Sequence, residues 1–276
     1  MRTPSFRTLP PGMRRRRVAA AALVVALALT GCATGGGHPL AQASGPDQLR
    51  VAHLRYDRHE YTETVDLVKG YLQYQSGAGD LDDAHFLLGM CYVQQKDWPL
   101  AATEFSELTT NFADSPRTPD AQYWLAVAYW KQAHGAPYDQ DMTLRAIAQC
   151  DHFLALYPTH PKVAEVAAIK RDGRNRIAEK AVRNGRLYLK LSQFGPARYY
   201  FEKVQRDYAD TPWLEQAKVG EAEALFAQGK KDEARAALGT DRSTWSDSDA
   251  RRRATALLKR IGVVAPLPAS AEGAPG

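Results

Sequence analysis

The feature that most constrains the fold is a spaced set of small and large residues that recurs along the chain. In residues 85–116 the set comprises Gly89 and Tyr92, followed by Ala101 and Phe105. Apolar residues around them recur at intervals of three and four, as on one face of a helix. Two antiparallel helices approach closely only where small residues lie at their crossing, and large side chains fill the space beside them. The pattern therefore predicts a pair of helices with Gly89 and Ala101 at the crossing.

Related units precede and follow this one, and no stretch between residues 47 and 238 alternates as a strand would. The residues equivalent to Phe105 are spaced 37, 45, 51 and 37 positions apart: Val68, Phe105, Cys150, Phe201 and Leu238. Three second helices end alike, in "TNFADSP", "ALYPTHP" and "RDYADTP", each with an aromatic residue ahead of a proline. These residues resemble the tetratricopeptide repeat, which implies an all-α superhelix of about five helix pairs.

The regular pattern is interrupted by an insertion at 131–142 and by one long helix, basic in its middle, expected over 159–190. The basic helix is either a solvated face or a docking surface for an acidic partner. After Leu238 one more amphipathic helix is expected as a C-terminal cap over the last repeat. The repeat domain is therefore predicted to cover residues 47–262, and residues 263–276 are predicted to form a disordered tail.

The N-terminus reads as a secretion signal, with either Met1 or Met13 as its start. An arginine-rich segment precedes an apolar run that is shorter than the roughly 20 residues needed to cross a bilayer. "LTGC", residues 29–32, resembles the bacterial lipobox. This resemblance implies that residues 1–31 are a lipoprotein signal peptide and that Cys32 carries a diacylglycerol and an N-acyl chain such as palmitate. Ala33 at the next position suggests the outer membrane, where two or three acyl chains hold a protein firmly.

Charge is concentrated in the leader. Residues 1–31 hold six arginines and no acid, so removing them from the formal charge of +5 leaves −1. A mature chain this close to neutral has no sequence-wide electrostatic basis for nucleic acid binding. Residues 32–46 are rich in Gly, Pro, Ala and Ser, and are predicted to form a lipidated flexible tether.

Catalytic and metal-binding patterns are absent from the sequence. It has no GxSxG, P-loop, HExxH or GxGxxG motif, and its seven histidines are scattered. We therefore expect a binding scaffold, not an enzyme, with no metal and no cofactor beyond the lipid. Cys91 and Cys150 lie in apolar helical stretches, which favours buried thiols and leaves a disulfide between them open.

The lipobox, the tether and the repeats together resemble the BamD-like family of outer membrane assembly lipoproteins. The resemblance is strongest over residues 176–234, where Tyr188, Ala197, Phe201 and Tyr208 follow the family pattern. It implies a lipid-anchored scaffold at the periplasmic face of the cell outer membrane. Such a scaffold binds the β-barrel assembly core subunit through its C-terminal repeats, meets other assembly lipoproteins and receives unfolded outer membrane proteins on its N-terminal repeats.

Other classes of function stay open at this point. The chain could be a lipoprotein pilotin for a secretin or pilus, or a cell-envelope adaptor for a Tol–Pal-type complex. If the resemblance to the assembly lipoproteins holds, the first helices of the repeats would line a concave groove suited to an extended, aromatic-rich peptide. By repeat register, the residues expected to face this groove are His53, Tyr56, Phe86, Met90, Tyr123, Trp130 and Lys131.

Overall fold

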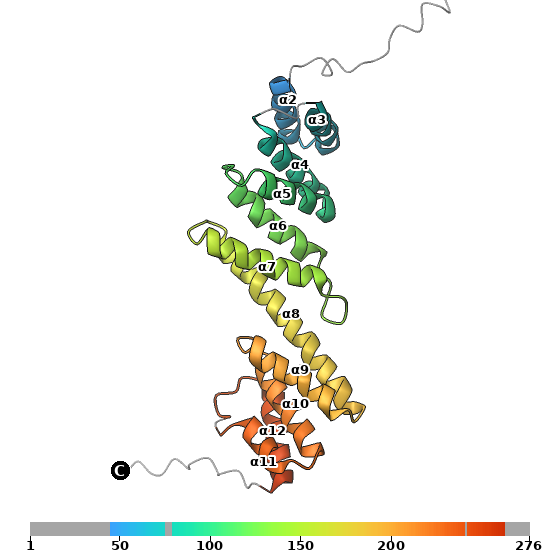
Figure 1. Cartoon of the computed structure of the whole chain (residues 1–276), viewed down its shortest axis with the longest axis vertical. Helices are drawn as coiled ribbons and strands as arrows, with labels where there is room; N and C mark the ends of the chain where they lie inside the picture. Colours follow the sequence, from blue (N-terminus) through green and yellow to red (C-terminus); the bar gives the residue numbers. More distant parts are fainter. Residues whose placement is uncertain (1–44, 75–78, 241, 263–276) are drawn as a thin grey trace, which may run out of the picture.

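The computed structural model describes residues 45–74, 79–240 and 242–262 (Figure 1). The predicted signal peptide, Cys32 and the predicted C-terminal tail lie outside these residues. Within them the chain forms eleven α-helices and no strand. The helices are α2 (Gly45–Asp57), α3 (Tyr61–Tyr74), α4 (Leu81–Gln95), α5 (Trp98–Asn111), α6 (Thr118–Gln132), α7 (Asp141–Leu156), α8 (Val163–Lys190), α9 (Phe194–Asp207), α10 (Leu214–Ala227), α11 (Lys231–Leu238) and α12 (Ser248–Ile261).

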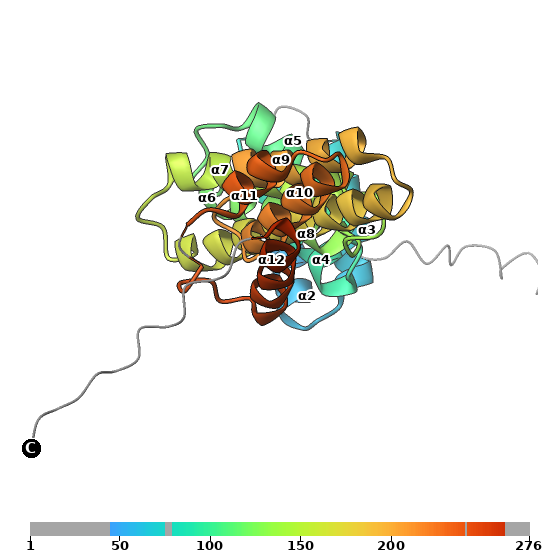
Figure 2. The same ribbon diagram turned by 90° about the horizontal axis from the view of Figure 1, so that it is seen from below.

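The helices associate as five antiparallel pairs stacked along one axis: α2 with α3, α4 with α5, α6 with α7, α8 with α9, and α10 with α11 (Figure 1). A view along the stack shows the pairs turned relative to one another, as in a superhelix (Figure 2). Helix α12 packs on α10 and α11 and buries Ala254, Leu257 and Leu258 there. The predicted tetratricopeptide-repeat superhelix, with five pairs and a C-terminal cap, is confirmed.

Four of the five pairs use the same turn between their first and second helices. In the α4–α5 turn, the N–H of Lys96 donates to the carbonyl of Val93 (3.1 Å) and that of Asp97 to the carbonyl of Tyr92 (2.9 Å). These two bonds define a Schellman motif, which needs a residue in the left-handed conformation. In the four turns this residue is His59, Lys96, Ser192 or Gly229, with φ values of 64°, 60°, 57° and 80°. The fifth pair, α6–α7, carries the insertion in place of this turn.

The turns between pairs also repeat, at the three places where an aromatic residue precedes a proline. The carbonyl of Phe112, which caps α5, accepts a hydrogen bond from the N–H of Ser115, at 3.0 Å. Equivalent bonds of 3.1 Å join His160 to Tyr157 and Thr211 to Tyr208. The shared sequence ending therefore corresponds to a shared backbone turn.

Phenylalanine rings lie directly on glycine backbones where the helices of a pair cross. A Cβ atom added to Gly89 would lie 2.7 Å from Phe105, and one added to Gly185 would lie 2.6 Å from Phe201. Phe201 also meets Gly220 of α10, so its ring is held between two first helices. Both rings are fully buried, and the predicted crossing of small against large residues is confirmed.

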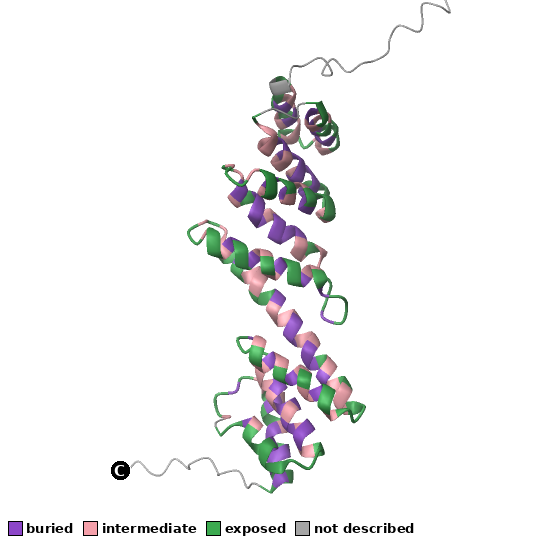
Figure 3. Cartoon of the chain, in the orientation of Figure 1, coloured by how far each residue is buried: buried purple, intermediate pink, exposed green. Residues whose placement is uncertain are grey.

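Buried residues follow the helix faces that meet along the whole stack (Figure 3). Cys91 and Cys150 belong to these faces, are fully buried and are free thiols. Burial raises the pKa of each thiol to about 12, so neither is reactive at neutral pH. The buried-thiol interpretation is confirmed, and the disulfide that the sequence left open is not formed.

The Phe201 site gives a direct test of the packing. Gly220→Ala would push a methyl group into the Phe201 ring, and we expect a loss of about 1–3 kcal/mol in the free energy of unfolding. Gly70→Ala in α3 is the control, because its new methyl meets nothing within 4 Å and should stabilise the helix by about 0.5–1 kcal/mol. Urea unfolding followed by circular dichroism measures both. A Gly220→Ala variant as stable as the wild type would contradict this packing.

The repeated turn predicts two substitutions of opposite sign. Ser192 holds a positive φ of 57° despite its side chain, so Ser192→Gly should raise the free energy of unfolding by about 1 kcal/mol. Gly229→Ala, at the same place in another pair, should lower it by a similar amount, about 1 kcal/mol. Thermal unfolding of the two variants side by side checks the signs. Two shifts of the same direction would show that the turns are not equivalent.

Candidate functional site

Two of the predicted groove residues, His53 and Phe86, belong to one cluster that two charged side chains connect. His53 Nε2 of α2 is hydrogen-bonded to Asp83 Oδ2 of α4 at 2.6 Å. Arg117, just before α6, forms an ion pair with Asp83 Oδ1 at 2.7 Å, and its guanidinium lies 5.1 Å from the centre of the Phe86 ring. The structure thus joins His53 and Phe86 through Asp83 and Arg117, in a cluster that extends from α2 across α4 to the residue before α6.

The electrostatics of this cluster centre on Asp83. Its hydrogen bond with His53 is the largest cause that holds the pKa of the Asp83 carboxyl below its usual value, and Arg117 acts in the same direction. Burial acts the other way. Arg117 and the half-buried rings of His53 and Phe86 remain partly open to solvent, so the cluster presents a cation and two flat rings to a ligand.

Tyr123 is placed differently from the other predicted groove residues. It is only 7% exposed, and its hydroxyl donates to Glu165 Oε2 of α8 at 2.6 Å. Lys162 lies 5.1 Å from the ring centre and donates to the other Glu165 oxygen at 2.8 Å. Burial raises the pKa of Tyr123. Its side chain therefore links α6 to α8 inside the stack.

The remaining predicted residues contact other parts of the chain. At the far end of α6, Trp130 stacks under Arg176 of α8 at 4.0 Å, and Lys131 lies 5.9 Å from the Trp98 ring. Tyr56 packs edge-on against Tyr61, with ring centres 5.4 Å apart. Met90 is half-buried against the N-terminal core. The seven residues thus divide into separate groups, and only His53 and Phe86 share one.

A polar ladder that the sequence reasoning missed runs along the start of the first helices. The third residue of α4, α6, α8 and α10 is in turn Asp83, Asp120, Glu165 and Gln216. Each bridges to a neighbouring repeat. The bridges of Asp83 and Glu165 are described above. Asp120 lies 3.4 Å from His160. The side-chain amide of Gln216 donates to Asp247, and its oxygen accepts a hydrogen bond from Arg253 at 2.8 Å. An acid or amide at the third position of each helix that follows an aromatic–proline turn is a signal that could have found three of these residues, Asp120, Glu165 and Gln216.

The basic side chains in the middle of α8 form hydrogen bonds and ion pairs with other parts of the chain. Arg176 donates to the carbonyl of His134 (2.9 Å) and Lys180 to that of Tyr138 (2.6 Å), which fastens the insertion to α8. Arg174 binds the Asp210 carboxylate and so fastens the α9–α10 turn. The hydrogen bonds to Asp210 raise the pKa of Arg174. Between residues 170 and 183, the basic stretch is therefore engaged within the chain.

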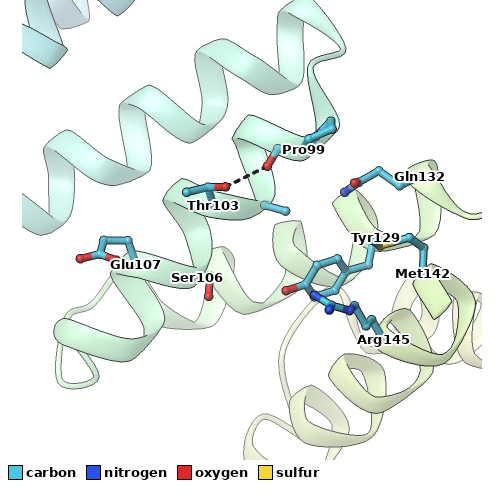
Figure 4. A pocket seen from close by; sticks show the side chains of 9 residues that line it. Pro99, Thr103, Ser106, Glu107, Tyr129, Gln132, Met142 and Arg145 are labelled. Carbon is cyan, nitrogen blue, oxygen red and sulfur yellow. Dashed lines mark hydrogen bonds between the residues drawn. The ribbon is translucent and has the colours of Figure 1, made fainter.

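A pocket of about 330 Å³ opens between α5, α6 and α7, on the side of the second helices (Figure 4). Arg145 lies 6.0 Å from the Tyr129 ring on one wall. On the other wall Thr103 donates to the Pro99 carbonyl at 3.1 Å, beside Ser106 and Glu107. These residues give the pocket a mixed polar and apolar surface.

Metal-binding clusters and membrane-spanning helices are both absent from the described residues. Across residues 45–74, 79–240 and 242–262, no three His, Cys, Asp or Glu side chains gather as a metal site would require. In the same ranges no helix is both long enough and apolar enough to cross a membrane.

Comparison with known proteins links the middle of the stack to one family. Residues 92–172, from the end of α4 into α8, match the model of the YfiO family, described as outer membrane lipoprotein. A search of the curated proteins gave no match.

Among solved structures, the chain is similar to TTC0263, a thermophilic TPR protein of Thermus thermophilus, with 18% identity over 78% of this chain and 100% of that one (TM-score 0.34). It is also similar to a tetratricopeptide repeat protein of Parabacteroides merdae ATCC 43184, with 14% identity over 90% and 94% of the two chains (TM-score 0.37). At these scores the fold assignment rests on the chain's own helix pairs and turns.

The Asp83 cluster predicts a pH-dependent contribution to stability. The folded-state pKa of Asp83 is lowered, so its stabilisation is present above the unfolded value of about 3.9 and is lost as pH falls through the folded value. Asp83→Asn should therefore lower the free energy of unfolding by about 1 kcal/mol near neutral pH, and this difference should shrink below about pH 4.

Urea titrations at several pH values measure the difference. Asp114→Asn is the matched control, because Asp114 is exposed on the α5–α6 turn and has no ion pair within the described chain. A deficit of Asp83→Asn that stays constant down to the lowest pH would contradict the role given to its charge.

Proposed function

We propose that this chain is a lipid-anchored scaffold on the periplasmic face of the outer membrane, where it serves β-barrel assembly. The observation that carries the proposal is the match of residues 92–172 to an outer membrane lipoprotein family. The "LTGC" segment ahead of the repeats supports the anchor, because acyl chains on Cys32 would hold the protein at the membrane without a spanning helix.

The architecture supports a binding role. Each helix pair contacts mainly its neighbours, so the stack is extended and offers a long surface on which its first helices would meet a partner. The cluster of His53, Phe86 and Arg117 lies on that face in the N-terminal repeats. Aromatic rings beside a cation suit an extended peptide rich in aromatic residues, which is the chemistry of an unfolded outer membrane protein. The C-terminal repeats would bind the assembly core subunit and other assembly lipoproteins.

Depletion with complementation tests the function. Removing the chain from cells should reduce many outer membrane β-barrel proteins together, because all of them would depend on one assembly scaffold. A plasmid copy of the wild type should restore them. Quantitative proteomics of outer membrane fractions gives the measurement. Loss of a single secretin or of pili alone would contradict the proposal and identify a pilotin.

The same experiment tests the anchor. Cys32→Ser should release the folded protein into the soluble fraction and fail to restore the barrels, because no acyl chain can be attached. Ala33→Ser, at the neighbouring position, is the control and should behave as the wild type. A Cys32→Ser protein that stays with the membrane would overturn the lipid anchor but leave the scaffold function standing.

A further inference from the structure

The C-terminal half of the stack contains a pocket in which one arginine, Arg186, has no carboxylate at hydrogen-bond distance. The pocket has a volume of about 390 Å³ and lies between the first helices α8 and α10 and the cap α12. Its lining residues are Arg186, Leu189, Lys190, Glu223, Asp249 and Arg253. It is separate from the His53 cluster, and none of the residues predicted to line the groove contributes to it.

Each carboxylate of the pocket forms its hydrogen bonds with a cation other than Arg186. Arg253 binds both oxygens of Glu223, at 3.1 and 2.6 Å. Asp249 accepts a hydrogen bond from Arg252, which lies on the outer face of α12. The other Asp249 oxygen, Oδ2, lies 3.7 Å from Arg253 and 3.9 Å from Arg186, so neither arginine is at hydrogen-bond distance from it.

Arg186 is left with a neutral partner. Its guanidinium donates to the Gln216 amide oxygen, which Arg253 also uses. Its nearest carboxylate, Asp249, is 3.9 Å away, beyond hydrogen-bond distance. The Arg186 side chain is 38% exposed. Burial together with the like charge of Arg253 lowers its pKa, against the opposing charges of Asp249, Glu223 and Asp247. A partly buried guanidinium whose nearest carboxylate is beyond hydrogen-bond distance can still form a charge-assisted hydrogen bond with a ligand carboxylate.

Lys190 and Leu189 complete the surface. Lys190, one turn further along α8, is exposed and has no ion pair in the described part of the chain. The end of the α8 macrodipole accounts for cations near the last turn, but it does not account for an arginine drawn into a pocket. Leu189 is half-buried beside them and offers an apolar contact.

We propose that this pocket binds an acidic peptide segment of a protein partner, in which a Glu or Asp carboxylate pairs with Arg186 and Lys190 while a neighbouring apolar side chain covers Leu189. The fork of the guanidinium matches a carboxylate, and Lys190 adds a second charge. The inference rests on the proposed scaffold function in one respect, namely that the ligand belongs to a protein partner. It adds the chemistry of the partner and the residues that select it.

The test uses two labelled peptides and the full-length protein, purified from membranes in a non-ionic detergent. The probes are fluorescein-labelled Gly-Leu-Glu-Leu-Glu-Leu-Gly and the same peptide with Gln in place of Glu. Fluorescence anisotropy should give an affinity for the Glu peptide about tenfold higher than for the Gln peptide, as expected for one charge-assisted contact. Equal affinities, or no binding of either peptide, would overturn the proposal.

Variants assign the preference to this pocket. Arg186→Gln and Lys190→Gln should each reduce the Glu-over-Gln ratio, whereas Arg183→Gln should keep it, because Arg183 is exposed and already paired with Glu179 at 2.7 Å. Lys190→Gln keeps the test valid if Arg186→Gln does not fold, since Lys190 is a surface side chain. A ratio unchanged in Lys190→Gln and in a folded Arg186→Gln would refute the assignment.

Vesicles separate a peptide from a lipid ligand. Binding to phosphatidylglycerol–phosphatidylcholine vesicles should be the same for an unlipidated Cys32→Ser protein and for the Cys32→Ser, Arg186→Gln double variant. A requirement for Arg186 in vesicle binding, without any peptide preference, would replace the proposal with a membrane contact. Because the peptide measurement needs no barrel-assembly component, its failure is distinguishable from a failure of the depletion experiment.

Discussion

The stack depends on the contact between a phenylalanine ring and a glycine backbone. Phe105 lies on Gly89, and Phe201 lies between Gly185 and Gly220. An isolated helix pair cannot bury its apolar face, so each pair is stable only when it packs on its neighbours. Phe201 provides such packing directly, because its ring contacts Gly185 in its own pair and Gly220 in the first helix of the next pair. The missing side chains at the glycines allow backbones to come close enough for continuous burial along the chain.

Polar residues then fix how successive pairs are joined. The third residue of four first helices bridges to an adjacent repeat, and the cations of α8 hold both the insertion and the α9–α10 turn. Such contacts add less free energy than the apolar core, but they select one arrangement of neighbours. A binding surface spread over several helix pairs needs this fixed geometry, because a ligand that spans repeats meets residues from each of them.

Local sequence patterns were sufficient to predict most of the fold. The small and large residues at the crossings, the aromatic–proline endings and the amphipathic cap all act through contacts within a pair or across one turn, so a single sequence reveals them. The groove residues were harder to predict. Tyr123 and Phe86 occupy the same place in adjacent repeats, yet Tyr123 is buried against Glu165 and Phe86 lies under Arg117. The two rings differ because the following repeat places different side chains on them. The position of a residue within its own repeat does not predict those side chains.

The sequence by itself determined that the chain is an all-helical repeat and where its pairs begin and end, because those properties depend on periodicity and on nearby turn residues. Only the tertiary structure decided which charges are satisfied. The basic segment of α8 looked uniform in the sequence, but Arg174 is bound by Asp210, a residue 36 positions away, while Arg186 meets only Gln216 at hydrogen-bond distance. Whether a cation is free to bind a partner depends on side chains brought together by stacking, so it emerges only when the helices are in place.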